Sequence, residues 1–394
     1  MQVVKKNEKV NAFVAIEFVL CAAMIFFTTI HRSSITSLFF TFSFLILLSY
    51  FIIIGSRVKS VYFSFLIVIL LLSIIFVLIN TARNNEVVSF EYFKPYFMFA
   101  STIIMLFVVF CIDVNRATKD FILKFNVFIG LLYIIAYNFY PEYQHELVVL
   151  GFGNPNFTGM WLLQSVLYTV IGAIVLDSIP WRIFSFAVAV YDYIILTKTE
   201  ARNSLIALML FFVLIIIIKL RRTPHFSNGF VFFVNILPIL FVPFYLTYVN
   251  IAGENSWLSF LVNEGKTLDS RVAIWRSEFQ QLGAEWLTGN YSHIRGNAHN
   301  SHLVVLCSFG AIVLVLTIIY MYKISAEINK TCNTKKKMYC MAAYFAIIFM
   351  GFGEGGLFAN GMGIYIMACS FILIARYNFE DEQNKKLVLK EVNT

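Results

Sequence analysis

The residues best suited to chemistry are gathered in one segment, residues 269–303. It contains three arginines, two tryptophans and three histidines, and it ends where a long apolar run begins. Guanidinium groups stay charged and bind phosphate oxygens through paired hydrogen bonds. Imidazole can take a proton from a hydroxyl group near neutral pH. These residue types together predict a site that binds an anionic group and accepts a proton.

The candidate anion-binding residues are four arginines that we expect on one side of a membrane: Arg202, Arg271, Arg276 and Arg295. Cations beside lipid suit a lipid-linked phosphate, which a guanidinium group can hold at two oxygens. The alternative is that these are ordinary arginines that face solvent or lipid headgroups. Arg271 and Trp275 lie one helical turn apart, so their side chains share a helix face.

The candidate proton acceptor is His299, directly before an apolar run. Its neighbour Asn300 could fix the imidazole tautomer or hold a sugar, and it could equally cap a helix. Asn154 and Asn156 precede another apolar run, after two glycines, and could bind hydroxyl groups. The alternative at these two asparagines is a plain turn, because Gly and Asn-Pro favour turns.

The composition shows which kind of secondary structure must position these residues. The chain of 394 residues is 60% hydrophobic and 13% charged, whereas soluble domains carry about 25% charged residues. Apolar runs of roughly 20 residues recur along it, and each is long enough to cross about 30 Å of hydrocarbon as a helix. Backbone groups in lipid must be satisfied internally, which favours helices. The sequence therefore predicts an all-α, polytopic membrane protein.

We expect about twelve spans and one large extracytoplasmic loop. The expected spans are 11–30, 35–54, 60–79, 95–112, 121–140, 157–177, 181–197, 203–219, 228–250, 301–322, 338–351 and 357–376. The expected organisation is a membrane domain over 1–250, the loop over 251–300, and the last three spans with a cytoplasmic tail over 301–394. Within the loop, Asp269 is a candidate N-cap, apolar residues follow at helical spacing, and Gly283 can end a short amphipathic helix.

The distribution of Lys and Arg sets the expected orientation. Most of the 30 basic residues fall on one side of the spans, which the positive-inside rule places in the cytoplasm. Both termini are then cytoplasmic, and the loop 251–300 faces outward from the plasma (inner) membrane. The net charge of +8 follows mostly from this bias, so we do not interpret it as nucleic-acid binding.

Two further features limit the chemistry. The expected outer segments have no Asp-x-Asp pair to hold a divalent cation, so arginine would have to neutralise phosphate charge without a metal or other cofactor. Asp192 lies within an expected span, where a carboxylate is costly unless it is paired or hydrated. It could contact a partner such as Arg202 or line a polar cavity.

Three landmarks give the chain a resemblance to the O-antigen ligase and polymerase superfamily, which includes Wzy-type polymerases and WaaL-type ligases. They are the NPNFTG stretch at 154–159, the TEARNS turn at 199–204, and Arg271-x3-Trp275 followed by His299–Asn300-x2-Leu303. The layout of spans and loop agrees with a GT-C-like membrane enzyme. The chain departs from the family pattern at Glu200 and Asn203, where relatives have a small residue and a glycine.

The resemblance implies glycosyl transfer at the outer face from an undecaprenyl-pyrophosphate-linked glycan to a glycan acceptor. Arg202, Arg271 and Arg276 would bind the pyrophosphate, Arg295 would add positive charge, and His299 would be the base. Trp275 could stack on a sugar or on lipid. The implied partners are a chain-length regulator and a flippase of the same pathway.

Our first hypothesis is a polymerase that extends a lipid-linked chain. The alternatives are a ligase that transfers glycan to lipid A-core and, from a different class, a flippase for lipid-linked oligosaccharides. A flippase predicts charged residues along a central cavity, whereas here they concentrate on one external loop.

Overall fold

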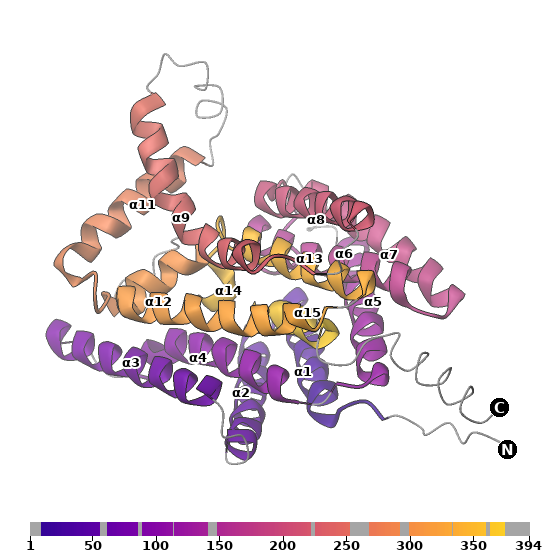
Figure 1. The fold of residues 1–394 in the computed structure, drawn as a ribbon, viewed down its shortest axis with the longest axis horizontal. Helices are drawn as coiled ribbons and strands as arrows, with labels where there is room; N and C mark the ends of the chain where they lie inside the picture. The colour runs from indigo at the N-terminus through magenta and orange to yellow at the C-terminus, as the bar shows by residue number, and fades with distance from the viewer. Residues whose placement is uncertain are drawn as a thin grey trace.

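The computed structural model describes residues 9–55, 61–85, 89–112, 114–140, 148–221, 225–252, 268–291, 299–332, 334–359 and 363–374, and these residues contain helices and no β-strand. The helices are α1 Ala12–Thr29, α2 Ser33–Gly55, α3 Val61–Asn84, α4 Phe90–Cys111, α5 Arg116–Phe139, α6 Pro155–Val175, α7 Ile179–Lys198, α8 Arg202–Leu220, α9 Asn228–Ala252, α11 Leu268–Leu282, α12 Ser301–Lys330, α13 Lys335–Met350, α14 Gly356–Ala359 and α15 Gly363–Ile374. Figure 1 shows them gathered into one bundle.

The prediction of a polytopic membrane protein is confirmed. In the described part of the chain, α1 to α9 and α12 are ten helices that are long and apolar enough to cross a membrane. Large apolar side chains are exposed on their outer faces, among them Leu45, Leu71, Phe186 and Ile216. Such side chains are stable against lipid and costly against water. The outer surface of the bundle is therefore suited to hydrocarbon.

The last two expected spans differ from the other ten. Helix α13 has 16 residues, which is roughly 24 Å of helix and less than a full span. The expected span 357–376 is divided between the short helix α14 and α15, which follow the glycine-rich turn 351–356. Helix α13 is almost completely buried and packs against α6, α8, α9 and α15. Neighbouring helices rather than lipid surround it, so its length is not set by the membrane.

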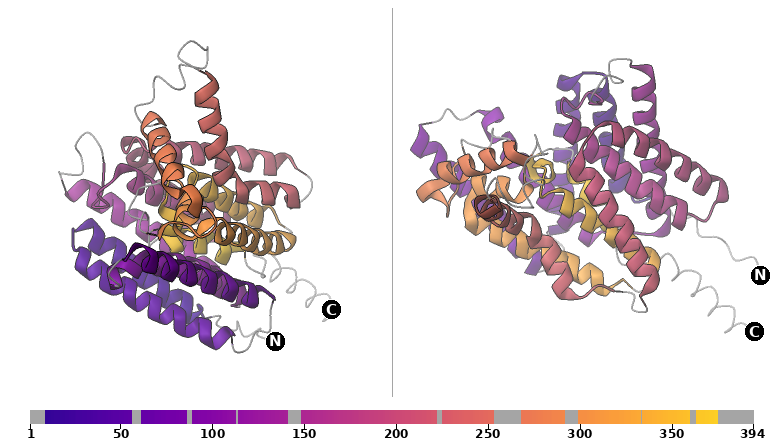
Figure 2. Two further views of the ribbon diagram at one scale, coloured as in Figure 1. Left: turned by 90° about the vertical axis from the view of Figure 1, so that its left-hand side faces the viewer. Right: turned by 90° about the horizontal axis from the view of Figure 1, so that it is seen from above.

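The C-terminal part of α9 and helix α11 project from one end of the bundle (Figures 1 and 2). Helix α9 contains Pro238 and Pro243, which remove backbone hydrogen bonds and bend helices. Helix α11 is the amphipathic helix that we expected within the loop, and it ends before Gly283, whose φ is +42°. Residues 253–267 and 292–298 of the expected loop lie outside the described residues.

The segment after α11 is fixed against a break in α12. At Gly310 the backbone of α12 leaves the helical region, with φ 79° and ψ 174°. The freed backbone groups bond to the incoming segment: Asn290 N donates to Cys307 O at 2.6 Å, and Ala311 N donates to Trp286 O at 2.8 Å. A Cβ atom at Gly289 would meet the backbone of Gly310. This interlock holds α11 over the beginning of α12.

The expected orientation can be tested with two cysteine variants placed at exposed positions at opposite ends of the bundle. Gln280 is exposed on α11, and Lys335 is exposed at the start of α13. In intact cells, a membrane-impermeant maleimide should label Gln280→Cys and should label Lys335→Cys only after the membrane is opened. The five buried native cysteines and the half-buried Cys111 set the background. The opposite labelling pattern would put α11 in the cytoplasm and would contradict the proposed use of an external donor.

Candidate functional site

The structure brings four residues from distant parts of the chain together at one end of the bundle, and we call them the Glu354 cluster: Asn203, Arg271, His299 and Glu354. Arg271 Nη2 donates a hydrogen bond to Glu354 Oε1 at 3.0 Å, within an ion pair. His299 Nδ1 lies 3.8 Å from Glu354 Oε2. Asn203 Nδ2 lies 3.5 Å from Glu354 Oε1. A buried carboxylate thus connects a cation to a candidate base.

Arg271 is held by the packing of α11. Trp275, one turn further along, has no exposed surface and meets Phe241 and Tyr245 of α9 edge-on, with ring centroids 6.5 and 6.1 Å apart. Such aromatic contacts anchor a helix face. Burial lowers the pKa of Arg271, and the charge of Glu354 opposes this. The expected stacking of Trp275 on a sugar or on lipid is not available in this structure, because the indole is part of the core.

The role expected for Asn300 also needs correction. Its Oδ1 accepts hydrogen bonds from the backbone N–H groups of His302 and Leu303, and its Nδ2 donates to Pro238 O and Phe352 O. Asn300 is completely buried, and its amide is fully used by capping α12 and tying it to its neighbours. The capping alternative is therefore right, and the predicted contact with a sugar or with the imidazole of His299 is wrong.

His299 stands at the entrance to α12 in a left-handed backbone conformation, with φ 44°. Its imidazole is 16% exposed, and Nδ1 has no hydrogen-bond partner among the described residues. The Nδ1 edge faces Glu354 at 3.8 Å, which is longer than a hydrogen bond, and the amide of Asn300 is used elsewhere. In Ser-His-Asp triads a carboxylate hydrogen-bonded to this nitrogen holds the imidazole and stabilises its protonated form, so a closer approach of Glu354 would give the same arrangement here.

The turn that carries Glu354 is fastened to two helix N-termini. Ser301 N donates to Gly351 O at 2.8 Å, and Ser301 Oγ donates to Glu354 O at 2.5 Å. Asn203 Nδ2 donates to Gly353 O at 3.2 Å, and a Cβ atom at Gly353 would collide with the Asn203 side chain. Glycine is required there so that α8 can approach the turn. The carboxylate position is therefore fixed by α8 and α12.

The NPNFTG stretch contributes indirectly. Asn154 Oδ1 accepts from Asn156 N at 2.8 Å and caps α6, which supports the plain-turn alternative for Asn154. Gly159 lies so close to Ala201 that a Cβ atom would collide with it. In the described contacts Asn154 and Asn156 do not touch the Glu354 cluster. This stretch fixes α6 against the TEARNS turn, which in turn carries Asn203.

Of the four arginines, one lies within the cluster. Arg202 is the first residue of α8, beside Asn203, and is exposed. Arg276 is exposed on α11, five residues from Arg271 and therefore about 140° around the helix from it. Arg295 lies outside the described residues. The structure thus places Arg202 next to the cluster and turns Arg276 away from Arg271.

The N-terminus of α8 adds positive potential at the same place. No side-chain hydrogen bond caps this helix, so its first N–H groups keep their capacity to bind an anion. Helices α6 and α12 also begin at this end, where their caps are Asn154 and Asn300. The positive end of each helix dipole therefore points toward the cluster. The site favours a negatively charged ligand near Arg202 and Arg271.

Asp192 does not belong to this site. It is completely buried, and its Oδ2 accepts a hydrogen bond from Ser165 Oγ of α6 at 2.6 Å. Of the two alternatives, a partner within the bundle and a polar cavity, the structure shows a partner, which is Ser165 instead of Arg202. Among the described residues, no group of three or more His, Cys, Asp or Glu side chains could hold a metal ion.

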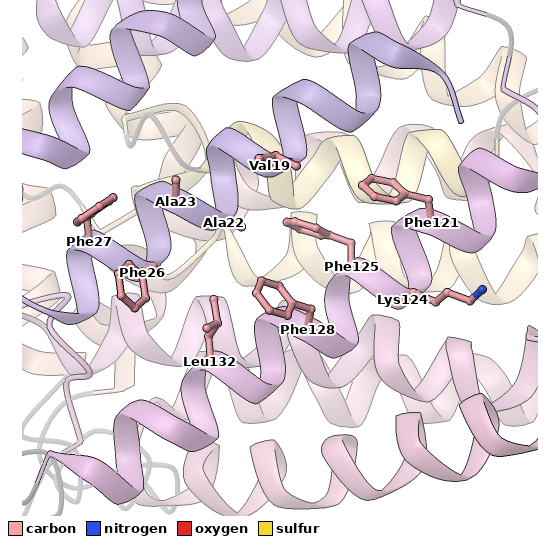
Figure 3. A pocket seen from close by; sticks show the side chains of 10 residues that line it. All are labelled: Val19, Ala22, Ala23, Phe26, Phe27, Phe121, Lys124, Phe125, Phe128 and Leu132. Atoms are coloured by element: carbon pink, nitrogen blue, oxygen red, sulfur yellow. The ribbon is translucent and has the colours of Figure 1, made fainter. Parts of the chain in front are cut away.

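A separate groove lies on the outside of the bundle between α1 and α5 (Figure 3). Its volume is about 570 Å³, and its lining is apolar except for Lys124 at one end. Phe26, Phe125 and Phe128 point into it in Figure 3. Such a lining suits a hydrocarbon chain, and Lys124 is the single cation that it offers. The groove is therefore not a second candidate for the anion site.

Sequence reasoning missed Glu354 and Asn203. Glu354 is an acidic residue in a glycine-rich turn, GFGEGG, between two apolar runs. That setting was the available signal, because a charge in so short a segment beside lipid needs a partner. For Asn203 the signal in the sequence is its departure from the family pattern, which has a glycine there. Compared with known proteins, the chain matches no protein-family model, and no curated protein is significantly similar to it in sequence.

Proposed function

We propose that this protein is a polysaccharide polymerase at the outer face of the plasma membrane. It would transfer glycan from an undecaprenyl-pyrophosphate-linked donor to the growing lipid-linked chain without a metal ion. The observation that carries the proposal is the Glu354 cluster, in which a buried arginine and a histidine flank one carboxylate at the end of the membrane helices.

The cationic half of the site suits the pyrophosphate. Arg271 uses one N–H of Nη2 to bind Glu354, and a guanidinium group has five N–H donors in all. The remaining donors, Arg202 and the uncapped start of α8 can therefore bind phosphate oxygens. Their positive charge is most valuable as the leaving group departs, because negative charge develops on it then.

The other half of the site suits proton transfer. With Nδ1 of His299 facing Glu354, Nε2 is the nitrogen left to accept a proton from an acceptor hydroxyl. The Glu354 carboxylate then stabilises the imidazolium that forms. Glu354 and Asn203 are positioning residues in this scheme, and Arg271 and His299 are the catalytic residues.

The reaction balances within these groups. The acceptor oxygen forms a bond to the anomeric carbon of the donor while the bond between that carbon and the phosphate oxygen breaks. The bonding electrons leave with undecaprenyl pyrophosphate, whose new negative charge lies against Arg271 and Arg202. The hydroxyl proton moves to His299 Nε2 and is later released to water. No metal or other cofactor is needed for the charge balance.

A ligase that transfers glycan to lipid A-core would use the same arrangement with a different acceptor. The test is transfer by the purified full chain in liposomes that contain a synthetic undecaprenyl-pyrophosphate-linked repeat unit, followed by separation of products by chain length. We expect a ladder of longer chains that forms at full rate in EDTA, because arginine takes the place of the metal.

Two other results would contradict parts of this proposal. Transfer that occurs only when lipid A-core is added would replace the polymerase with a ligase. Transfer lost in EDTA and restored by Mg²⁺ or Mn²⁺ would end the metal-independent mechanism, and Glu278 and Glu354 would be the first carboxylates to examine as ligands. A protein that moves the donor across the bilayer and makes no glycosidic bond would be a flippase.

A further inference from the structure

Two carboxylic acids lie inside the membrane helices, away from the Glu354 cluster. Glu17 of α1 accepts hydrogen bonds at Oε2 from Ser43 Oγ of α2, at 2.6 Å, and from Tyr365 OH of α15, at 3.1 Å. Asp192 of α7 accepts one at Oδ2 from Ser165. Both side chains are completely buried. The second oxygen of each, Glu17 Oε1 and Asp192 Oδ1, has no hydrogen-bond partner among the described residues.

No cation in the described part of the chain compensates for these acids. Neither forms an ion pair with a described residue, and the hydrogen bonds given above are their polar contacts within that part of the chain. An ionised carboxylate at this depth is costly unless a positive charge accompanies it. Hydroxyl donors alone do not neutralise it. Each acid therefore needs a bound proton or another small cation when the helices are packed as they are here.

Two other polar side chains, Cys21 and Tyr133, lie in the region between the two acids. Cys21 lies one turn from Glu17 on α1, and Tyr133 of α5 is close enough to both Cys21 and Asp192 for their charges to interact. The Tyr133 hydroxyl is buried and without a hydrogen-bond partner among the described residues. A Cβ atom at Gly130, one turn earlier, would collide with the Asp192 carboxylate. Glycine at that position lets the acid lie against α5.

The connection continues to the end of the bundle that carries the Glu354 cluster. Tyr137 lies one turn beyond Tyr133 on α5, and its hydroxyl accepts a hydrogen bond from Lys198 Nζ at 2.6 Å. Lys198 is the last residue of α7, four residues before α8 begins. Tyr137, Tyr133 and Cys21 thus lie in order between the exposed end of α7 and the two acids, and Tyr133 makes no hydrogen bond in the described part of the chain.

We propose that Glu17 and Asp192 form an intramembrane proton-binding tract that exchanges protons with water at the end of α5 and α7. The ligand is the proton. Among the described residues Asp192 has one oxygen partner, Ser165, which already donates its hydrogen to the carboxylate, whereas a metal cation needs about six oxygen ligands. This role is independent of glycan transfer, which uses the Glu354 cluster.

The groups that face the acids determine what controls their protonation. Glu17 faces Tyr365 and Ser43, with Cys21 on its own helix and Cys369 of α15 in the same region. Asp192 faces Ser165 and Tyr133. None of these groups is a base that carries a positive charge. Protonation of the acids should therefore follow the pH of the water that reaches them.

The test is labelling of the full-length protein in membrane vesicles with dicyclohexylcarbodiimide, an apolar reagent that reacts with protonated carboxyl groups inside membranes. The labelled residues are identified by peptide mass spectrometry over a range of pH. We expect modification at Glu17 and Asp192 that declines as pH rises and is unaffected by Na⁺. Glu17→Gln and Asp192→Asn should each lose only their own label, and the label retained on the other acid shows that the variant is folded.

The link between Glu17 and Asp192 is tested by comparing two tyrosine variants. After a jump to high pH, Glu17 should lose reactivity more slowly in Tyr133→Phe than in the unaltered protein. Tyr168→Phe, which removes another buried tyrosine hydroxyl, one that donates to Ile366 O, should not change that rate. Labelling that is absent at low pH or constant with pH would overturn the proposal. Protection by Na⁺ would replace the proton with a metal cation, and an unaltered rate in Tyr133→Phe would separate the two acids.

Discussion

Replacing Arg271 by alanine is expected to lower glycan transfer by about 10²–10³-fold, the usual effect of removing one donor that stabilises charge in a transition state. Arg271→Lys should also be impaired, because lysine keeps the charge and loses the planar group that holds two oxygens at once. The measurement is the rate of chain extension in liposomes at equal protein level. Arg276→Ala is the matched control, since Arg276 is on the same helix but turned away from Glu354.

A second variant separates catalysis from stability. Arg271→Ala leaves the buried Glu354 without its cation, and an uncompensated buried charge destabilises a protein by about 3–5 kcal/mol. The double variant Arg271→Ala with Glu354→Gln removes that charge and should recover thermal stability. Transfer should remain as low as in the single variant. Recovery of transfer together with stability would show that Arg271 serves the fold and does not act on the donor.

The fold was largely predictable because lipid imposes a simple rule on the chain. Each of the first ten apolar runs had to become a helix long enough to hide its backbone from hydrocarbon, and each did. The rule fails for α13 and for α14 with α15, which are surrounded by protein and not by lipid. There, packing and the glycines of residues 351–356 determine where the chain turns.

The site was less predictable, because the spacing of residues shows which side chains share a face of a helix. It does not show which other part of the chain that face contacts. Arg271 and Trp275 share a face of α11 as expected, yet that face turns into the core, so Trp275 packs against α9 and Arg271 meets Glu354. Glu354 follows Arg271 by 83 residues in sequence. Only the tertiary fold could show that a charge in a glycine-rich turn completes the cluster.

For the same reason, the candidate motifs of the sequence do not all form the site. Asn154 and Asn300 use their side chains as helix caps, a role that short polar residues before an apolar run often have. These caps fix the starts of α6 and α12, and the contact between Gly159 and Ala201 fixes α8. Several residues whose type would suit substrate binding are structural instead. They hold the backbone segments that carry Arg271, His299 and Glu354.

Replacing His299 by asparagine is expected to slow transfer by about 10²–10⁴-fold, the range for loss of a general base. Asparagine suits this position because His299 has a positive φ, a conformation that asparagine adopts more readily than most residues. The side chain remains polar but cannot take up the proton. Donor binding should persist, because Arg271 and the start of α8 are unchanged.

Single-turnover measurements distinguish this result from a loss of binding. With donor already bound, the rate of the chemical step should fall in His299→Asn, while the donor concentration at half-saturation stays within a few-fold of the original. Added imidazole should restore part of the rate if the missing group is a base. His31→Ala is the matched control, since His31 is an exposed histidine beyond the C-terminal end of α1, also with positive φ. Normal single-turnover rates in His299→Asn would remove the base assignment and leave Glu354, whose carboxylate is the nearest alternative acceptor, as the group to test by Glu354→Gln.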